Sequence, residues 1–151
     1  MENLKSEQEI LQGILYEDEF IRMYFDENLN AIVKDWKKEV SSDKFREIII
    51  HLLMQIIQVR MSLKHRDVNI FVDGRKIGTK AFSLENMAWL DKDIHPLYVR
   101  NKIAKKVFFV SDNSTDNESV AQYIKETNAA NTGLQMNIFT DEEKSKTWLM
   151  I

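Results

Sequence analysis

The sequence predicts an α/β protein with a mixed, largely parallel sheet, an N-terminal antiparallel hairpin and about four helices covering both faces. Residues 20–25 and 31–36 alternate between two faces, as the strands of a half-buried hairpin do. Apolar runs at 68–72 and 107–110 are short and nearly continuous, which is typical of strands buried on both faces, and residues 134–139 are predicted as a further strand. Segments with helical spacing separate these runs, and this alternation implies crossover connections between parallel strands.

The composition indicates one folded domain spanning residues 1–151. Of these residues 44% are hydrophobic and 30% are charged, an ordinary balance for a globular protein. A chain of this length buries roughly two-thirds of the surface that it exposes when unfolded. No internal repeat, linker or low-complexity tract divides the sequence.

Charge and cysteine content exclude several classes of function. The net charge is -3, and the basic residues are scattered, so we expect no nucleic-acid partner. We interpret Lys105 and Lys106 as residues that flank a strand. The absence of cysteine excludes disulfides, thiolate chemistry and cysteine-ligated metals. Since no apolar run reaches membrane-spanning length and the N-terminus does not read as a signal peptide, we expect a cytoplasmic protein.

Residues 1–9 are polar, and we expect them to fray. A short strand at 14–16 could widen the hairpin, whose turn uses the Asp and Asn residues of 26–30.

A long helix is predicted over residues 43–60, with its N-cap among Ser41, Ser42 and Asp43. Its inward face carries apolar residues at helical spacing: Phe45, Ile48, Ile49, Leu52, Leu53 and Ile56. Ile50, Met54 and Ile57 widen this apolar arc well beyond the stripe of about 100° that covering a sheet requires. Two interpretations stay open: deep burial beneath other elements, or a self-association surface that makes a homodimer.

The stretch from Asp67 to Trp89 is predicted to run from a buried strand through a polar loop into a helix. The loop opens at Asp73, and Ser83 is placed to cap the helix. Further on, Pro96 should kink or break the helical pattern near residues 94–95, because proline lacks an amide hydrogen and clashes with the preceding turn.

The last third is predicted as a loop at 111–114, a helix at about 118–130, a strand at 134–139 and a final helix. Gly133 is placed to end the connection before the strand. Thr140 and Glu143 have the spacing of a capping box for the final helix.

Polar side chains follow the predicted strands at their carboxyl ends, where ligands bind in open α/β sheets if the strand order reverses there. This placement defines the candidate binding residues: Asp73, Arg75, Ser83, Trp89, Ser111 and Asp112. The alternative interpretation is that the polar residues serve only as turns and caps and that Trp89 belongs to the core.

The sequence contains no catalytic or metal-binding signature, and we expect neither an enzyme nor a cofactor. His51, His65 and His95 do not stand at ligand spacing with another histidine or with a carboxylate on one helical face. We interpret His51 as solvated and His95 as a helix-end residue. Residues 112–123 begin like a calcium loop but lack its glycine and its glutamate.

Dispersed residues along nearly the whole chain resemble a known family: Tyr16–Asp26, Asp35–Trp36, Ser42–Arg46, Phe71–Asp73, Trp89–Leu90 and Trp148–Leu149. At these positions the chain is similar to short bacterial STAS-type proteins of the SpoIIAA-like family. These are related in fold to anti-sigma-factor antagonists and to CRAL-TRIO lipid carriers. The resemblance implies a mixed sheet with helices on both faces, no enzymatic activity, and a role in binding a partner or a small ligand.

In the antagonists, a serine soon after the terminal Asp of a strand is phosphorylated and switches partner binding. Asp73 matches that Asp, but Gly74 follows it and the first serine is Ser83, after a longer loop. This departure argues against a phosphorylation switch, with Ser83 as its site if one exists. Relative to CRAL-TRIO proteins the chain is short, which argues against a large lipid cavity. Two functions stay open: a non-catalytic regulatory or protein-interaction module, and a binder or carrier of a small amphipathic ligand.

Overall fold

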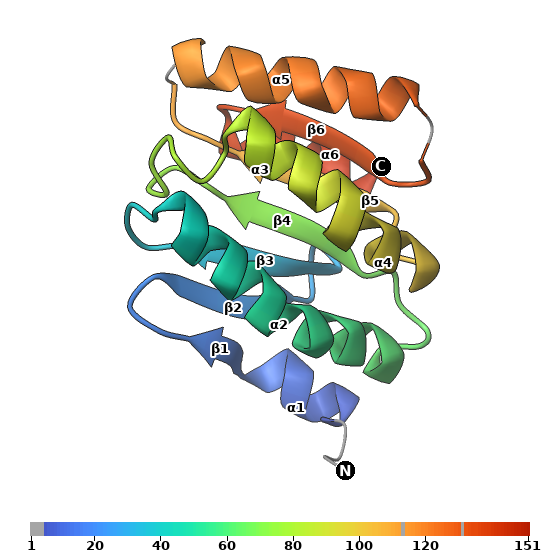
Figure 1. The fold of residues 1–151 in the computed structure, drawn as a ribbon. Coiled ribbons are helices and arrows are strands. Elements are labelled where there is room, and N and C mark those ends of the chain that lie inside the picture. The colour runs from blue at the N-terminus through green and yellow to red at the C-terminus, as the bar shows by residue number, and fades with distance from the viewer. Residues whose placement is uncertain (1–4, 113, 131) are drawn as a thin grey trace.

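The computed structural model describes residues 5–112, 114–130 and 132–151 and shows a six-stranded sheet with helices on both faces (Figure 1). In chain order the elements are α1 (Glu7–Gln12), β1 (Ile14–Glu17), β2 (Ile21–Asp26), β3 (Ala31–Trp36), α2 (Ser42–Ser62), β4 (Asn69–Asp73), α3 (Leu84–Trp89), the π-helical segment η1 (Leu90–Ile94), α4 (His95–Arg100), β5 (Lys105–Phe109), α5 (Ser114–Ala129), β6 (Gln135–Phe139) and α6 (Glu142–Met150). The predicted fold class is confirmed.

The strands lie side by side in the order in which they occur in the chain. β1, β2 and β3 are antiparallel, with Ile21 opposite Trp36 and Asp26 opposite Ala31, so the predicted hairpin and its short third strand are confirmed. β3 to β6 are parallel, and Asp73 at the end of β4 is a register partner of Asp35 on β3. The strand predicted at 68–72 is thus an inner strand of the sheet.

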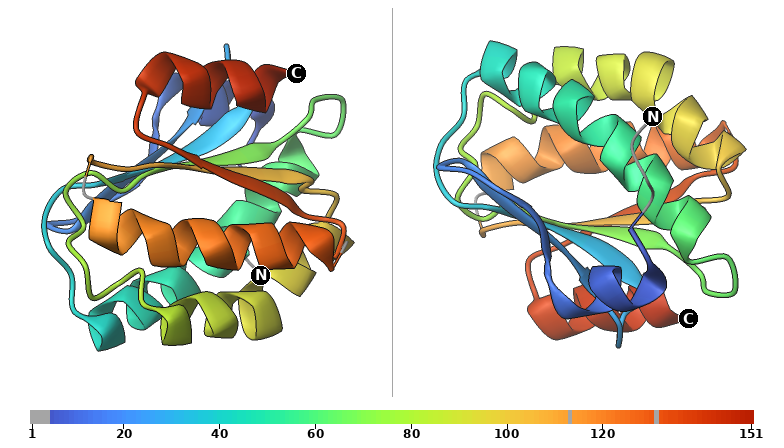
Figure 2. Two further views of the ribbon diagram at one scale, coloured as in Figure 1. Left: turned by 90° about the horizontal axis from the view of Figure 1, so that it is seen from above. Right: turned by 90° about the horizontal axis from the view of Figure 1, so that it is seen from below.

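The helices are distributed unevenly over the two faces. Because each parallel strand is added on the same side of the previous one, crossovers of one hand carry α2, α3–η1–α4 and α5 to one face. α6 covers the other face (Figure 2). The strand order does not reverse anywhere in the sheet that the structure describes, so the topological switch point that we hypothesised is not formed.

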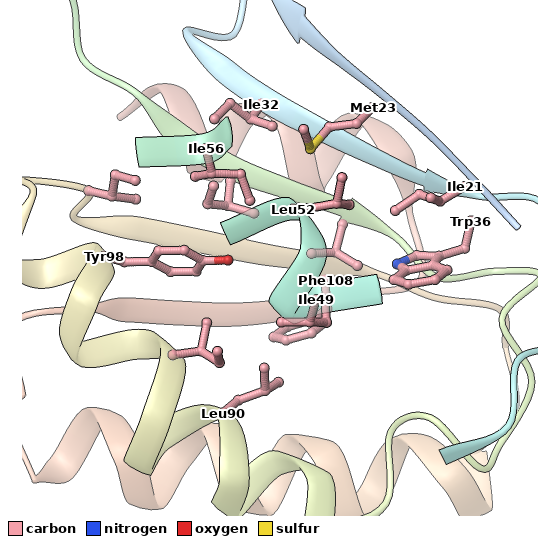
Figure 3. Close-up of a cluster of buried hydrophobic side chains, with 14 of the residues drawn as sticks. Ile21, Met23, Ile32, Trp36, Ile49, Leu52, Ile56, Leu90, Tyr98 and Phe108 are labelled. Atoms are coloured by element: carbon pink, nitrogen blue, oxygen red, sulfur yellow. The ribbon is translucent and has the colours of Figure 1, made fainter. Parts of the chain in front are cut away.

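The main core lies between the sheet and the larger helical layer. Figure 3 shows its centre, where side chains from β2 and β3 meet α2, η1 and α4. Its fully buried large side chains include Trp36, Phe45, Phe108 and Tyr98. A smaller core beneath α6 contains Leu29, Ala31, Val33, Phe71, Val107, Phe109 and Leu149.

The N-terminal segment differs from its prediction, because residues 7–12 form helix α1 instead of fraying. Ser6 and Glu9 make a capping box, with the Ser6 Oγ accepting from the Glu9 amide at 3.2 Å. Ile10 is buried in the main core, and Glu7 forms an ion pair with Arg66 at 3.1 Å. Tertiary contacts therefore stabilise a helix that is too short to be stable alone.

Most predicted helix ends hold to within two residues. α5, however, begins at Ser114, four residues before its predicted start, so the last residue of the loop predicted at 111–114 belongs to the helix. Ser41 caps α2 and Ser83 caps α3, as expected. α6 is capped by Asp141 and not by Thr140, because the Asp141 carboxylate accepts from the Lys144 amide at 2.9 Å. Pro96 stands at the second residue of α4, and the preceding turn has shifted to π-helical bonding. The break predicted near residues 94–95 is confirmed.

Side chains form hydrogen bonds with backbone groups of both edge strands, β1 and β6. At β6 the Asn128 amide donates to the Met136 carbonyl at 2.7 Å and accepts from the Met136 N–H at 2.9 Å. Asn137 accepts from the neighbouring Ile138 N–H at 2.8 Å. At β1, which has a register shift, Gln55 donates to the Leu15 carbonyl. Such contacts blunt the tendency of edge strands to pair with another chain.

Gly78, in the loop after β4, has a left-handed backbone with a φ of 85°. A Cβ added there would lie 2.5 Å from the Glu39 Cγ. We expect Gly78→Ala to lower the free energy of unfolding by about 1–2 kcal/mol, because a left-handed backbone disfavours L side chains. Gly13→Ala is the matched control: its added Cβ meets only the Glu9 carbonyl oxygen, at 3.7 Å, and its φ is -139°. Urea unfolding of both variants measures the difference, and equal losses would contradict the expectation.

Candidate functional site

Two of the predicted site residues, Asp73 and Arg75, form a bidentate ion pair at the end of β4. The Arg75 Nε donates to Asp73 Oδ1 at 3.0 Å, and an Arg75 terminal nitrogen donates to Asp73 Oδ2 at 2.7 Å. The guanidinium also lies over the Phe109 ring, 4.4 Å from its centre. The pair is therefore held in place from the α6 side of the sheet.

A second carboxylate, Asp35, adjoins this pair. Burial raises the pKa of Asp35, and the Asp73 carboxylate next to it raises that pKa further. Arg22 and Lys76 act in the opposite direction. Carboxylates and basic side chains are therefore interspersed at this strand end.

Ser83 and Trp89 lie on the other face of the sheet, on α3. The Ser83 Oγ accepts from the Asn86 amide at 3.1 Å, so it serves as the helix cap. Trp89 is half-buried, and the Arg46 guanidinium of α2 lies over its ring at 5.2 Å. Arg46 also donates to the Asn86 side chain at 2.7 Å. This cluster joins α2 to α3.

The structure does not gather the six candidate residues into one site. Arg75, paired with Asp73, lies over Phe109 of the smaller core, whereas Ser83 and Trp89 belong to the α3 end of the larger helical layer. Ser111 and Asp112 are exposed on the segment after β5. The turn and cap interpretation describes Asp73 and Ser83 well. The proposed binding role of all six residues stays a prediction.

The loop between β4 and α3 is anchored by its own apolar residues. Ile77 and Ala81 are buried, and the Ile77 carbonyl accepts from the Val40 amide at 3.0 Å. Phe82 packs edge-to-face against Phe45 and Phe108, with ring centres 6.1 and 5.4 Å apart. A loop held in this way presents Arg75 on a fixed support.

The structure brings together a buried polar cluster that the sequence interpretation missed. Lys106 lies on β5 and is 2% exposed, with its Nζ 3.0 Å from His95 Nε2. His95 Nδ1 lies 2.8 Å from Asp91 Oδ1, and Thr127 donates to the other Asp91 oxygen at 2.9 Å. The tautomer that donates from Nδ1 to Asp91 leaves Nε2 free to accept from Lys106.

A second buried lysine adjoins this cluster. The Lys34 Nζ donates to the Tyr98 hydroxyl at 3.1 Å, and Figure 3 shows that hydroxyl pointing into the core. Burial lowers the pKa of Lys106 well below its usual value, and the charge of Lys34 adds to this effect. Burial and the charge of Lys106 lower the pKa of His95 to about 4. We call Asp91, His95, Lys106, Tyr98 and Lys34 the buried polar cluster.

Two sequence interpretations are corrected by this cluster. Lys106 does not flank a strand but lies within β5. His95 is the first residue of α4, as the helix-end interpretation expects, and its side chain is also buried and hydrogen-bonded. Asp91 and His95 do share one helical face, four residues apart. Strand alternation was the available signal, since Lys34 stands between the inward residues Ile32 and Trp36.

The outer face of α2 carries exposed apolar side chains. Ile50 is 59% exposed, Met54 61% and Met61 49%, and Ile57 between them is half-buried. We call these four residues the α2 stripe. The interpretation that the whole apolar arc is deeply buried was therefore wrong for these four residues. The homodimer stays a prediction.

A groove of about 300 Å³ runs between α1, β1 and α2. Apolar side chains of Ile10, Leu15, Met54 and Val59 line it, and Lys5 and His51 stand among its polar residues. His51 is exposed, as predicted, and packs edge-on against Tyr16, with ring centres 5.2 Å apart. A space of this size and mixed lining suits a small amphipathic molecule.

Comparisons with known proteins found no matching family model, no matching curated protein and no matching solved structure. Within residues 5–112, 114–130 and 132–151, no three His, Asp or Glu residues are grouped so that they could hold a metal ion. None of the helices in the described part of the chain is long and apolar enough to cross a membrane.

Proposed function

We propose that this chain is a non-catalytic regulatory module of the STAS/SpoIIAA-like type, which acts by contact with another protein. The observation that carries the proposal is the exposed apolar surface of the larger helical layer. The α2 stripe lies on it, and Leu84 of α3 adds a side chain that is 58% exposed. Exposed apolar side chains that lie close together usually mark an interaction surface.

The polar residues at the strand ends fit a supporting role in this module. Asp73 and Arg75 are paired with each other, and the Ser83 hydroxyl is engaged as a cap. Since these groups already have partners within the chain, a binding protein would have to break those contacts to use them. The α2 stripe carries no such cost, so we place the main contact there.

Site-specific photo-crosslinking in cells tests the proposal. A photoreactive residue at Met54 should give discrete crosslinked species that mass spectrometry can identify. The matched control is Glu143, which is exposed on α6 on the other face of the sheet. A Met54 pattern that is empty, or that equals the Glu143 pattern, would contradict the proposal.

The groove between α1, β1 and α2 favours a second candidate function, the binding of a small amphipathic ligand. Lys5 could pair with an anionic head while the apolar wall receives a short chain. Decanoate is a suitable probe, with an expected dissociation constant on the order of 10–100 µM. Gln58→Trp should fill the groove and abolish binding, and Glu143→Trp should leave binding unchanged. No thermal shift with decanoate and no co-purified small molecule in native mass spectrometry would count against this function.

A further inference from the structure

We infer that the partner of the α2 stripe is a second copy of this chain, with the two α2 helices packed antiparallel about a two-fold axis. The inference rests on the proposed function, because it names the occupant of the same helical surface. It is carried by the spacing of the stripe and by the charges at its two ends.

The stripe forms one line along the helix. Ile50, Met54, Ile57 and Met61 follow each other at intervals of four, three and four residues, which keeps them on one side of an α-helix. The line is about 16 Å long at 1.5 Å per residue. This spacing is also that of the apolar positions along which two helices pack.

The spacing of the stripe is symmetric about its midpoint, between Gln55 and Ile56. In an antiparallel pair centred there, Ile50 of one copy meets Met61 of the other, and Met54 meets Ile57. Such a surface is self-complementary, as a two-fold interface requires. The methionines are unbranched and can adapt to the side chains that face them.

The charges at the ends of the stripe favour the antiparallel arrangement. Glu47 stands three residues before Ile50 on α2 and pairs with Lys44 at 3.3 Å, and Lys64 lies in the turn just after the cap residue Leu63; both are exposed. The same two-fold axis brings the Glu47 end of each copy to the Lys64 end of the other. A parallel pair would instead place like charges together at both ends.

The sheet edges make an alternative mode of self-pairing less favourable. Asn128 already bonds both backbone groups of Met136, and Gln55 bonds the Leu15 carbonyl. A contact limited to one helix from each copy is small, so we expect a weak dimer with a dissociation constant on the order of 10 µM.

Charge exchange tests the arrangement by sedimentation velocity at protein concentrations below and above about 10 µM. Glu47→Lys and Lys64→Glu should each weaken association about tenfold, because each creates two like-charge contacts per dimer. The double variant should return to within about twofold of the original affinity. Met150→Lys, at an exposed apolar residue of α6 on the other face of the sheet, should leave association unchanged. A monomer at all concentrations, or a dimer insensitive to both single exchanges, overturns the inference.

Disulfide trapping tests the direction of the helices without interference, because the chain has no cysteine. Differently tagged Ile50→Cys and Met61→Cys chains are mixed and oxidised. The antiparallel pair should give mainly the mixed disulfide, whereas like-with-like disulfides would overturn it. If Met54 crosslinks to a different protein while the chain is a monomer, the interaction function stands and the dimer fails, so the two failures are distinguishable.

Discussion

Replacing His95 with leucine is expected to lower the free energy of unfolding by about 3–4 kcal/mol, although the two side chains are similar in size. The loss comes from the neighbours of His95. Lys106 would stay buried without its hydrogen-bond partner at 3.0 Å, and Asp91 would lose the contact at 2.8 Å. Urea unfolding measures the change as a shift in midpoint at constant slope.

A double variant separates this effect from simple packing loss. In His95→Leu/Lys106→Met both members of the contact are apolar, so no polar atom of the pair is left stranded. We expect the double variant to be more stable than His95→Leu by about 2 kcal/mol or more. The single variant Lys106→Met completes the comparison. If the stability losses of His95→Leu and Lys106→Met simply add up to the loss of the double variant, the buried contact does not carry the effect.

Stability is expected to fall by about 3 kcal/mol as the pH is lowered from 6.5 to about 4. The pKa of His95 is lowered to about 4 in the folded protein, mainly by burial, whereas an unfolded histidine titrates near 6.5. In this window the unfolded chain therefore binds a proton that the folded chain does not, and unfolding becomes more favourable. The full contribution is present above pH 6.5 and is lost as the pH falls.

Lys106 and Asp91 also contribute to the pH dependence of stability, but outside this pH window. The pKa of Lys106 is lowered well below its usual value, chiefly by burial, so the stability should continue to rise above neutral pH for the same reason. Burial raises the pKa of Asp91, but its hydrogen bonds outweigh this and lower it overall, so Asp91 should act below the window. Urea unfolding at a series of pH values should show a clear slope for the original chain and a much flatter one for His95→Leu/Lys106→Met. Equal slopes would contradict the assignment.

Most of the fold could be predicted because its signals are local. The β2–β3 hairpin follows from two-residue alternation, and Ser41 and Ser83 follow from the need to satisfy the first amides of a helix. Helix α1 was missed although Ser6 and Glu9 have the spacing of a capping box, because a helix of this length also depends on burying Ile10 in a distant core. The cap of α6 was misplaced by one residue because Thr140 and Asp141 both have capping side chains, and only the backbone geometry selects Asp141.

The candidate site could be predicted only in part, because it depends on non-local geometry. The sequence places Asp73 and Ser83 at ends of elements, but whether they meet depends on strand order and on which face each element covers. The buried polar cluster draws Lys34, Lys106 and His95 from three elements. Lysine is typically a surface residue and histidine is intermediate in burial, so the cluster becomes visible only when β3, β5 and α4 are assembled.

The hydrogen bonds of Asn128 at the edge of β6 make the association state of the protein depend on whether that side chain stays an amide. The Asn128 amide donates to the Met136 carbonyl from its nitrogen and accepts from the Met136 N–H at its oxygen. Hydrolysis of that amide to a carboxylate would set two acceptors against each other and free the outer side of β6. Aged preparations of the protein should then associate through the outer side of β6, where the freshly made chain has both backbone groups of Met136 bonded by Asn128.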